Sequence, residues 1–374
     1  MRITVVTGFY PAEKMGGAEY QTLLLAQGLA DLGYEVVYLA THADEEGEFK
    51  VGNITVLTIP GWRTVGKTLH RQLLSKALQE SDPDICYVRT FRELATIVPL
   101  CKKASIPVVS VSCSTMETSP FLLGYHPLET INNLRSRDMI FHLSSFLSIH
   151  SSATHICNTK TLQQQIQRWF PRKPIGMIYN GQPVPPLDSL HSESSGQVIW
   201  VNNLKRLKRP EIFVKLANRL PQFRFVMIGG MAGGRLYTQN LRSLFRQAPK
   251  NFQYLGPMSL DQVNATISQS DLLLYTSLPV EGFGNSFLQA WFRGVPTLSL
   301  SFDLDGILER EGVGRCSKTF EQLVVDVQDL MEDETTSREM GRRARNYAVK
   351  HHSTEQMVAA YETLFMNVLT TTWK

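Results

Sequence analysis

Short runs of β-branched and other apolar residues alternate with helix-length segments along the chain, and this alternation limits the fold more than any other feature. The first strand is expected at 2–8 (RITVVTG), and the Gly16-Gly17 pair follows it. Apolar residues then recur at helical spacing over 18–32, and EVVYLA at 35–40 predicts a second strand. Because such strands connect through a right-handed crossover, this unit predicts a Rossmann-like parallel sheet.

The alternation occurs in two blocks. In the first block we expect further strands at 54–59, 85–88, 107–111, 154–157 and 175–179, and one or two helices within 128–152. The proline- and serine-rich stretch 183–196 predicts a linker, after which the pattern restarts. We therefore predict an α/β protein with two Rossmann-like βαβ domains that face each other across a cleft. The expected boundaries are domains at 1–182 and 197–352, and a C-terminal helix within 353–374 that packs back on the first domain.

Composition excludes several classes of protein. A chain of 374 residues has the length of two domains, and 43% apolar with 19% charged residues is typical of globular proteins. The net charge of +4, without a basic tail, disfavours nucleic acid as a partner. The N-terminus does not resemble a signal peptide, and no stretch predicts a membrane span. Five dispersed cysteines without CxxC spacing are typical of reduced thiols, so we expect a cytoplasmic protein: Cys86, Cys101, Cys113, Cys157 and Cys316.

Two loops that follow predicted strands could bind an anion. Gly16 and Gly17 precede a helix, whose first N–H groups attract negative charge, although a plain tight turn would look the same. Residues 202–209 (NNLKRLKR) place four cations between a strand and a helix. Such a loop can neutralise a diphosphate, and it can also be an ordinary solvated basic loop.

Residues 279–294 (PVEGFGNSFLQAWFRG) are the most informative stretch. Gly282 and Gly284 would let a ligand lie against the backbone, and the amides of 284–287 would open the next helix as anion donors. Glu281 could accept hydrogen bonds from sugar hydroxyls, and Gln289 could bind those of a ribose. By spacing alone, this stretch could also be a glycine-rich turn before an amphipathic helix.

The segment 271–298 resembles the sugar-nucleotide signature of retaining GT-B glycosyltransferases of family 4, also called glycosyl transferases group 1. That signature reads Glu-Gly-Phe-Gly, then Glu-Ala, then Gly-Val-Pro, and here it spans 281–296. Gly16-Gly17 resembles the N-terminal glycine loop of the family, and Tyr179-Asn180-Gly181 resembles the end of its first domain. Lys208 aligns with its phosphate-binding lysine. The resemblance covers about residues 2–365.

The resemblance implies transfer of a sugar from a nucleoside diphosphate sugar to a glycan, glycolipid or small-molecule acceptor, with retention of configuration. Lys208 and Glu281 would be the catalytic residues: Lys208 would offset charge on the leaving diphosphate, and Glu281 would hold the sugar. The first domain would bind the acceptor and the second the donor, without a metal or other cofactor. By family association, the product would belong to a surface polysaccharide or glycolipid. The implied donor contacts are Gly16, Gly17, Asn203, Lys208, Glu281, Gly282, Phe283, Gly284, Asn285, Ser286 and Gln289.

The chain departs from the family pattern at three positions. The second glutamate of the signature is Gln289, and the phosphate-binding arginine is Asn203. A histidine that contacts the donor sugar is absent near Cys113. These departures keep a second hypothesis open, a catalytically impaired binding or scaffold protein of the same fold. A Rossmann-type dehydrogenase or epimerase is a third, which the missing GxGxxG and the 281–296 signature disfavour.

Three further segments have two interpretations each. Residues 62–80 predict a basic amphipathic helix, which either covers the sheet or makes peripheral contact with an anionic membrane. The Asp82-Pro83-Asp84 and Asp303-Leu304-Asp305 triplets could bind a metal–diphosphate, but turn preferences favour simple turns.

Overall fold

The computed structural model describes residues 1–13, 16–120, 136–187, 195–280 and 282–372. The chain divides into two compact units, one comprising Met1–Gln182 and Thr354–Lys374, the other Pro183–Ser353. Each unit is a mainly parallel sheet with helices packed on it. The prediction of two α/β domains with Rossmann-like sheets is therefore confirmed.

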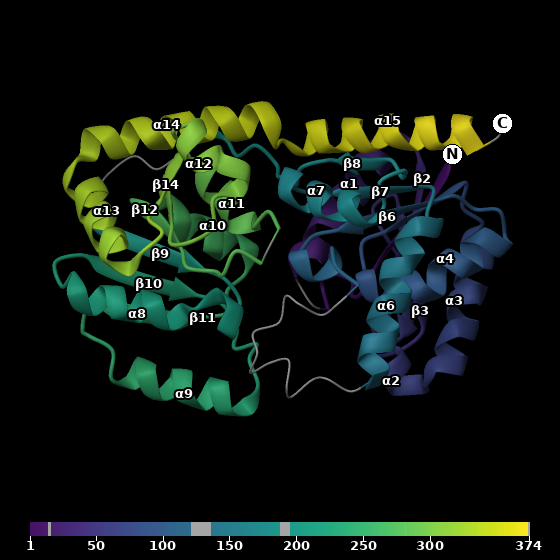
Figure 1. Ribbon diagram of the computed structural model, residues 1–374, viewed down its shortest axis with the longest axis horizontal. Helices are drawn as coiled ribbons and strands as arrows, with labels where there is room; N and C mark the ends of the chain where they lie inside the picture. The colour runs from purple at the N-terminus through teal and green to yellow at the C-terminus, as the bar shows by residue number, and fades with distance from the viewer. Residues whose placement is uncertain (14–15, 121–135, 188–194, 281, 373–374) are drawn as a thin grey trace. The chain divides into compact units, whose positions relative to one another are not determined.

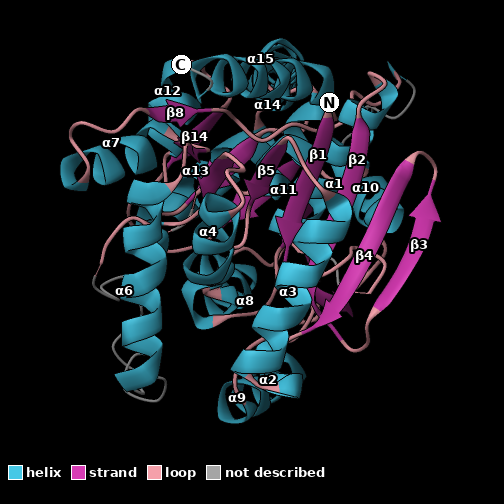
Figure 2. Ribbon diagram, turned by 90° about the vertical axis from the view of Figure 1, so that its right-hand side faces the viewer, coloured by secondary structure: helices cyan, strands magenta, loops and turns pink. Residues whose placement is uncertain are grey.

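The first unit is built on an eight-stranded sheet in the order β3-β4-β2-β1-β5-β6-β7-β8. All neighbours are parallel except β3 and β4, which form a hairpin at the sheet edge (Figure 2). The sequence did not predict β3, because all five of its residues are exposed and leave no buried apolar pattern. The strands are β1 (Arg2–Thr7), β2 (Glu35–Ala43), β3 (Gly47–Val51), β4 (Ile54–Pro60), β5 (Ile85–Val88), β6 (Val108–Ser112), β7 (Thr154–Cys157) and β8 (Ile175–Met177).

Helices of the first unit come from both ends of the chain (Figure 1). They are α1 (Gly17–Asp31), α2 (Trp62–Val65), α3 (Lys67–Ser81), α4 (Leu94–Lys103), α6 (Ser136–Ser151), α7 (Lys160–Trp169) and α15 (Thr354–Thr372), with 3₁₀ turns η1 (Phe91–Glu93) and η2 (Thr115–Glu117). The expected helix within 128–152 is represented by α6, and residues 128–135 lie outside the described part.

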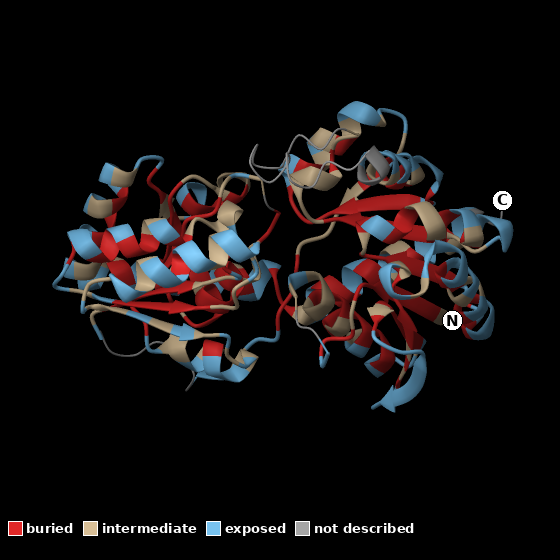
Figure 3. Cartoon of the chain, turned by 90° about the horizontal axis from the view of Figure 1, so that it is seen from below, coloured by how far each residue is buried: buried red, intermediate tan, exposed pale blue. Residues whose placement is uncertain are grey.

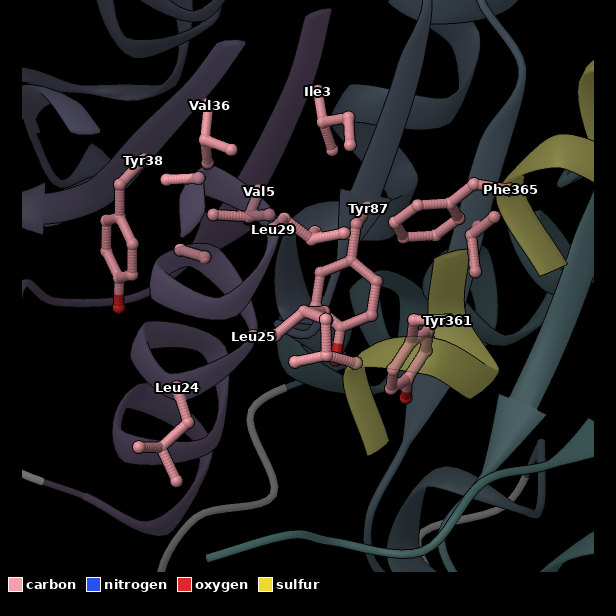
Figure 4. Packing of buried hydrophobic residues seen from close by; sticks show 14 of the residues in the cluster. Ile3, Val5, Leu24, Leu25, Leu29, Val36, Tyr38, Tyr87, Tyr361 and Phe365 are labelled. Atoms are coloured by element: carbon pink, nitrogen blue, oxygen red, sulfur yellow. The ribbon is translucent and has the colours of Figure 1, made fainter. Parts of the chain in front are cut away.

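The last helix, α15, completes the core of the first unit. Tyr361 and Phe365 of α15 face Tyr87 of β5, with ring centroids 5.2 and 6.3 Å away (Figure 4). A Cβ at Gly28 of α1 would overlap the Val358 side chain, so glycine permits the close approach of α1 and α15. The contact buries apolar surface on both helices, which is the main favourable term in folding.

The second unit has a six-stranded parallel sheet in the order β11-β10-β9-β12-β13-β14. Its inner strands are buried, its edge strand β11 is partly exposed, and the outer helix faces are exposed (Figure 3). The strands are β9 (Gln197–Val201), β10 (Arg224–Ile228), β11 (Phe252–Gly256), β12 (Leu272–Tyr275), β13 (Thr297–Ser299) and β14 (Gly314–Cys316). The helices are α8 (Pro210–Arg219), α9 (Arg235–Arg246), α10 (Leu260–Ser268), α11 (Asn285–Phe292), α12 (Ile307–Arg310), α13 (Phe320–Glu332) and α14 (Glu334–His351), with 3₁₀ turns η4 (Arg206–Lys208) and η5 (Leu304–Gly306).

Each sheet has one point where the strand order reverses. In the first unit the chain runs outward from β1 through β2 and β4, and then returns to β5 on the other side of β1. In the second unit it runs from β9 through β10 and β11, and returns to β12 on the other side of β9. Ligands of open α/β sheets bind at the carboxyl ends of the strands at such points. The loops after β9 and β12 are therefore the first place to look for a site.

Candidate functional site

Arg209 ties together three loops at the carboxyl edge of the second sheet. Its Nε donates to the Thr276 carbonyl at 2.6 Å, and its Nη2 donates to the Ser277 carbonyl at 3.1 Å and to Ser301 Oγ at 2.5 Å. These partners follow β12 and β13, whereas Arg209 follows β9. Burial lowers the pKa of Arg209, but an arginine stays charged at neutral pH. The sequence singled out this loop but not the clamping role of Arg209.

Lys208 is held beside this clamp, between β9 and β12. Its carbonyl accepts a 2.6 Å hydrogen bond from Thr276 Oγ1, and that hydroxyl accepts one from Trp200 Nε1 at 2.9 Å. The Lys208 ammonium lies 5.6 Å from the ring centroid of Tyr275, the last residue of β12. A cation is thus positioned at the reversal point of the sheet, where an anionic ligand would be bound.

The loops after β9 and β10 approach each other closely. Gly229 has φ +148°, and a Cβ there would overlap the Asn202 carbonyl, so only glycine fits. Asn203 is exposed at the same edge, with its carbonyl accepting from the Lys205 N–H at 2.9 Å. The structure thus brings Asn203 and Lys208 into one loop beside the glycine pair 229–230.

Among the residues of the 281–286 turn, Glu281 lies outside the described residues, so its sugar-binding role stays a prediction. Phe283 is buried, with its ring 4.7 Å from that of His352 and 5.9 Å from that of Trp291. This aromatic packing anchors the turn to the body of the unit. Sequence reasoning missed His352, which no motif identifies.

Helix α11 starts at the end of this turn. Gly284 is the N-cap residue of α11 and has an extended backbone, and no side chain caps the helix. A Cβ at Gly284 would lie 3.0 Å from the Tyr275 hydroxyl, so the turn packs tightly over the end of β12. Asn285 is partly exposed and Ser286 is buried in the first turn of the helix. The N-terminus of α11 therefore opens at the same edge as Lys208, and helix N-termini favour anions.

Gln289 is buried one turn further along α11. Its Nε2 donates to Asn264 Oδ1 of α10 at 3.2 Å, and its carbonyl accepts from Arg293 Nη1 at 3.0 Å. The side chain thus links α11 to α10. The predicted contact of Gln289 with a ribose stays a prediction, and a ligand would share this amide with Asn264.

The first glycine loop has a feature that the sequence did not reveal. Gly16 precedes α1 in extended conformation, and Gly17 begins the helix. A Cβ at Gly16 would overlap the carboxylate of Glu19, which sits in the first turn of α1. A carboxylate there is favoured by the helix dipole. An anion bound by Gly16 and Gly17 would therefore compete with the protein's own Glu19.

Polar residues gather near the position where the family histidine is absent: Arg89 is buried, whereas Cys113 and Glu117 are partly exposed. The Cys113 N–H donates to Glu117 Oε2 at 2.5 Å, and Arg89 follows β5 at the same sheet edge. Burial raises the pKa of Glu117 to about 7 and that of Cys113 to about 11. Sequence reasoning missed Arg89 and Glu117. A charged residue directly after the predicted strand 85–88 was the signal that could have found Arg89.

Both aspartate triplets lie in turns. Asp82 ends α3 in the left-handed conformation, and Asp84 accepts from the Arg2 N–H at 2.7 Å. Asp303 Oδ1 accepts from the Leu308 N–H at 3.1 Å at the start of α12. Over the described ranges, no three His, Cys, Asp or Glu side chains form a group that could hold a metal ion. In the same ranges, no helix has both the length and the apolar character needed to cross a bilayer.

Comparison with known families matches both halves of the chain. Residues 15–183 match the family described as Glycosyltransferase Family 4, and residues 188–347 match the family described as Glycosyl transferases group 1. One relative is the N-acetyl-alpha-D-glucosaminyl L-malate synthase of Bacillus anthracis, 26% identical over 185 residues, which cover 48% of this chain and 47% of that protein. The chain spans about half the length of the curated relatives it matches.

Two solved structures resemble the fold over nearly the whole chain. Sucrose-phosphate synthase from Thermosynechococcus elongatus superposes with a TM-score of 0.82 at 14% identity, covering 99% of each chain. Anabaena HepE, solved in complex with UDP and glucose, superposes with a TM-score of 0.74 at 18% identity, covering 97% of this chain and 99% of that one. Both likenesses confirm the two-domain α/β fold.

Proposed function

Because the chain belongs to the glycosyltransferases, with a family 4 domain followed by a group 1 domain, we propose that it transfers a sugar from a nucleoside diphosphate sugar to an acceptor hydroxyl, with retention of configuration. The observation that carries this proposal is the position of Lys208 and the 282–286 turn at the reversal point of the second sheet. Two loops from adjacent strands there offer a cation and a helix N-terminus to one ligand.

The proposed chemistry is electrostatic. When the bond between the sugar and the diphosphate breaks, negative charge grows on the leaving diphosphate. Lys208 and the N-terminal amides of α11 would stabilise that charge, which lowers the barrier because the donors are already in place. Arg209 is a positioning residue, since it holds the Lys208 loop against β12 and β13. We propose that these groups do the work without a metal ion.

The proposed donor is a nucleotide sugar bound by the second unit, with UDP as the first nucleotide to test. The support is the Anabaena neighbour, whose structure contains UDP and glucose. Asn203, Gly282, Phe283, Gly284, Asn285, Ser286 and Gln289 remain the proposed donor contacts, together with Glu281, Gly16 and Gly17.

The proposed acceptor site belongs to the first unit, and its acceptor is a glycan, a glycolipid or a small molecule. The Bacillus anthracis relative is named for an L-malate product, which adds small hydroxy acids to the acceptors worth testing. We propose a cytoplasmic location, because five free thiols are typical of a reducing compartment.

We also propose that α2 and α3 contact an anionic membrane surface. Arg63 and Lys67 are exposed and lie over the ring of Trp62 at 5.2 and 5.7 Å, and Arg71 is exposed one turn further on. Lys67 also lies 5.6 Å from the ring centroid of Phe141, so this basic end lies beside α6. Basic side chains together with a Trp are found on helices that lie at a membrane interface.

The outer face of α6 supports the same contact. It exposes Met139, Ile140, Leu143 and Leu147, with Ile140 67% and Leu147 55% exposed. Residues 139–151 contain no Lys, Arg, Asp or Glu. An uncharged apolar stripe of about two and a half turns, with cations at one end, fits lipid tails beside anionic headgroups.

The test of the main proposal is a binding and turnover experiment on the full chain. The melting temperature is measured with UDP, GDP, ADP and TDP and their sugar conjugates, since a ligand of the native state raises it. Donor hydrolysis and transfer are then measured with the nucleotide that binds. Binding with turnover supports the transferase, and binding without turnover supports the impaired binding protein of the same fold. No shift at millimolar concentrations would contradict the donor site.

A further inference from the structure

Arg89 is a buried cation at the reversal point of the first sheet. It is the first residue after β5, and its N–H donates to the Val6 carbonyl of β1 at 3.0 Å. Its side chain therefore starts at the carboxyl edge, between the two strands from which the chain diverges. Only 6% of its surface is exposed. Arg89 has the position in the first unit that Thr276, the first residue after β12, has in the second.

The partners of Arg89 are neutral. Nη1 donates to the Tyr87 hydroxyl at 3.2 Å, and Nη2 donates to Asn180 Oδ1 at 2.6 Å. The Nε–H is buried and has no hydrogen-bond acceptor in the described parts of the chain. A guanidinium has five N–H donors in a planar arrangement that suits a carboxylate or phosphate. The hydrogen bonds of the Arg89 guanidinium are therefore incomplete.

The neighbours of Arg89 balance its charge only in part. Within the described ranges it forms no ion pair, and burial raises the pKa values of Tyr87, Tyr361 and the Cys113 thiol, which keeps all three neutral. Two acidic side chains act on this group, Glu117 and Glu19, and the charge of each raises the pKa of Cys113. Burial raises the Glu117 pKa to about 7 in spite of Arg89, so Glu117 carries only part of a charge at neutral pH.

A buried charge that its neighbours balance only in part is costly, and buried charges are found paired or at sites that bind a counter-ion. We propose that Arg89 is the counter-charge for an anionic group, a carboxylate or a phosphate, on the substrate that binds at the carboxyl edge of the first sheet. This inference rests on the proposed function and deepens it, because it names the chemical class of that substrate. The anionic group belongs either to the acceptor or to the sugar of the donor.

Glu117 gives the site a second property. An anion beside Arg89 also approaches the Glu117 carboxyl, and a like charge favours the protonated form. Binding should therefore be accompanied by proton uptake near pH 7. A structural arginine that never meets a ligand would show no such uptake.

The experiment compares the wild type with Arg89→Met, Arg89→Lys and the control Arg92→Met, which removes an exposed arginine three residues away. Acceptors are tested as matched pairs: glycerol 3-phosphate with glycerol, glucuronate with glucose, and L-malate with its diamide. Donors are tested as UDP-glucuronate with UDP-glucose. Preference for the anionic acceptor assigns the group to the acceptor, and preference for the anionic donor assigns it to the sugar.

We expect the wild type to use the anionic member of one set at least tenfold better in kcat/KM. Arg89→Met should remove that preference, because it lacks the hydrogen bonds to the charged group. We expect its kcat/KM for the anionic member to fall by roughly 10- to 100-fold. Arg89→Lys keeps the charge but not the planar set of donors, so its preference for the anionic member should lie between those of the wild type and Arg89→Met. Arg92→Met should behave as wild type. Equal use of charged and neutral members by the wild type would overturn the proposal, even if Arg89→Met does not fold.

A failure of this proposal can be distinguished from a failure of the proposed function. UDP binding by the second unit should be the same in the wild type and in Arg89→Met. If no transfer is seen at all, the melting temperature is measured with malonate and inorganic phosphate against chloride at equal ionic strength. A shift in the wild type that Arg89→Met lacks supports the anion site alone, and identical shifts contradict it.

Discussion

At the residue scale, the candidate site depends on a few side chains that hold one lysine in place. Lys208 lies at the end of β12 because Thr276 binds its carbonyl and Arg209 binds the carbonyls that follow β12. The segments 202–209 and 281–296 could be identified from the sequence, because their residue types and order follow a family pattern, and the roles of Lys208 and Glu281 stay predictions. Arg209 and Arg89 were not assigned roles, because a single arginine has no pattern and its partners are distant in sequence.

Replacement of this lysine is the most direct test at the residue scale. Lys208→Ala should reduce transfer by roughly a hundredfold, because a preorganised charge opposite the leaving diphosphate is lost. Steady-state kinetics with the nucleotide sugar that binds would measure it. Lys205→Ala is the matched control, since Lys205 is an exposed cation of the same loop. Equal rates in the two variants would remove Lys208 from the mechanism.

At the element scale, the first unit places a basic helix, an apolar helix and a buried ion pair close together. Glu93 of η1 is fully buried, with its Oε2 3.3 Å from His70 Nε2 of α3 and its Oε1 3.6 Å from His42 Nε2. The helices themselves were predictable from apolar spacing. The β3 edge strand and the His70–Glu93 pair were not, since an exposed strand has no apolar pattern and a tertiary ion pair leaves no local signal.

The His70–Glu93 pair predicts a pH dependence of stability. Burial alone would lower the His70 pKa, but the Glu93 carboxylate and the Pro60 carbonyl outweigh it and raise the pKa. Protonated His70 therefore stabilises the folded state fully below the unfolded pKa of about 6.5, and this contribution is lost as pH rises through the folded pKa.

The measurement is urea denaturation of the wild type and of His70→Gln at pH 6 and pH 8.5. The difference in unfolding free energy between the two proteins should be larger at pH 6. His42 does not cancel in this difference, because it lies beside the same carboxylate and its pKa is lowered by burial and also by His70, Arg92 and Arg63. The same comparison in a His42→Gln background therefore isolates the contribution of His70. A difference that grows with pH would mean that the pair is not ionised as proposed.

The α6 stripe predicts membrane binding that depends on apolar contact. Leu143→Ser together with Leu147→Ser should weaken sedimentation with anionic phospholipid vesicles by tenfold or more, because each buried leucine contributes about 1.5–3 kcal/mol. Val325→Ser, an exposed apolar position of α13 in the second unit, is the control. Binding by the wild type should weaken at high salt, since the cations of α2 and α3 are screened. A wild type that does not sediment, or that dimerises through this face, would contradict the membrane contact.

At the scale of the whole molecule, the two blocks of alternating strands and helices predicted two α/β sheets, and the structure has both. The strand order follows from short right-handed connections between neighbouring parallel strands. The chain leaves the first unit after Gln182 and returns at Thr354, whose N–H donates to the Gln182 carbonyl at 3.0 Å. The sequence did not reveal that α15 packs into the core of the first unit. Gly28 marks the contact, but a glycine within a helical pattern indicates only a locally weaker helix.

The role of α15 predicts that its core residues stabilise the first unit alone. Phe365→Ala should cost about 3–5 kcal/mol of unfolding free energy, the usual range for a buried phenylalanine. Met366→Ala, at an exposed position of the same helix, should change it by less than about 0.5 kcal/mol. Urea denaturation measures both, and nucleotide binding by the second unit should survive in each. A loss of nucleotide binding in Phe365→Ala at low denaturant would contradict the independence of the two units.

The return of α15 to the first core also fixes an order of events during synthesis. The second unit has all its residues once Ser353 has left the ribosome, whereas the first unit must wait for Tyr361 and Phe365, which emerge later. Domains of most nascent chains fold from the N-terminus onward. In this chain the unit whose synthesis begins first is completed last, so the apolar surface around Tyr87 stays uncovered until α15 has been synthesised.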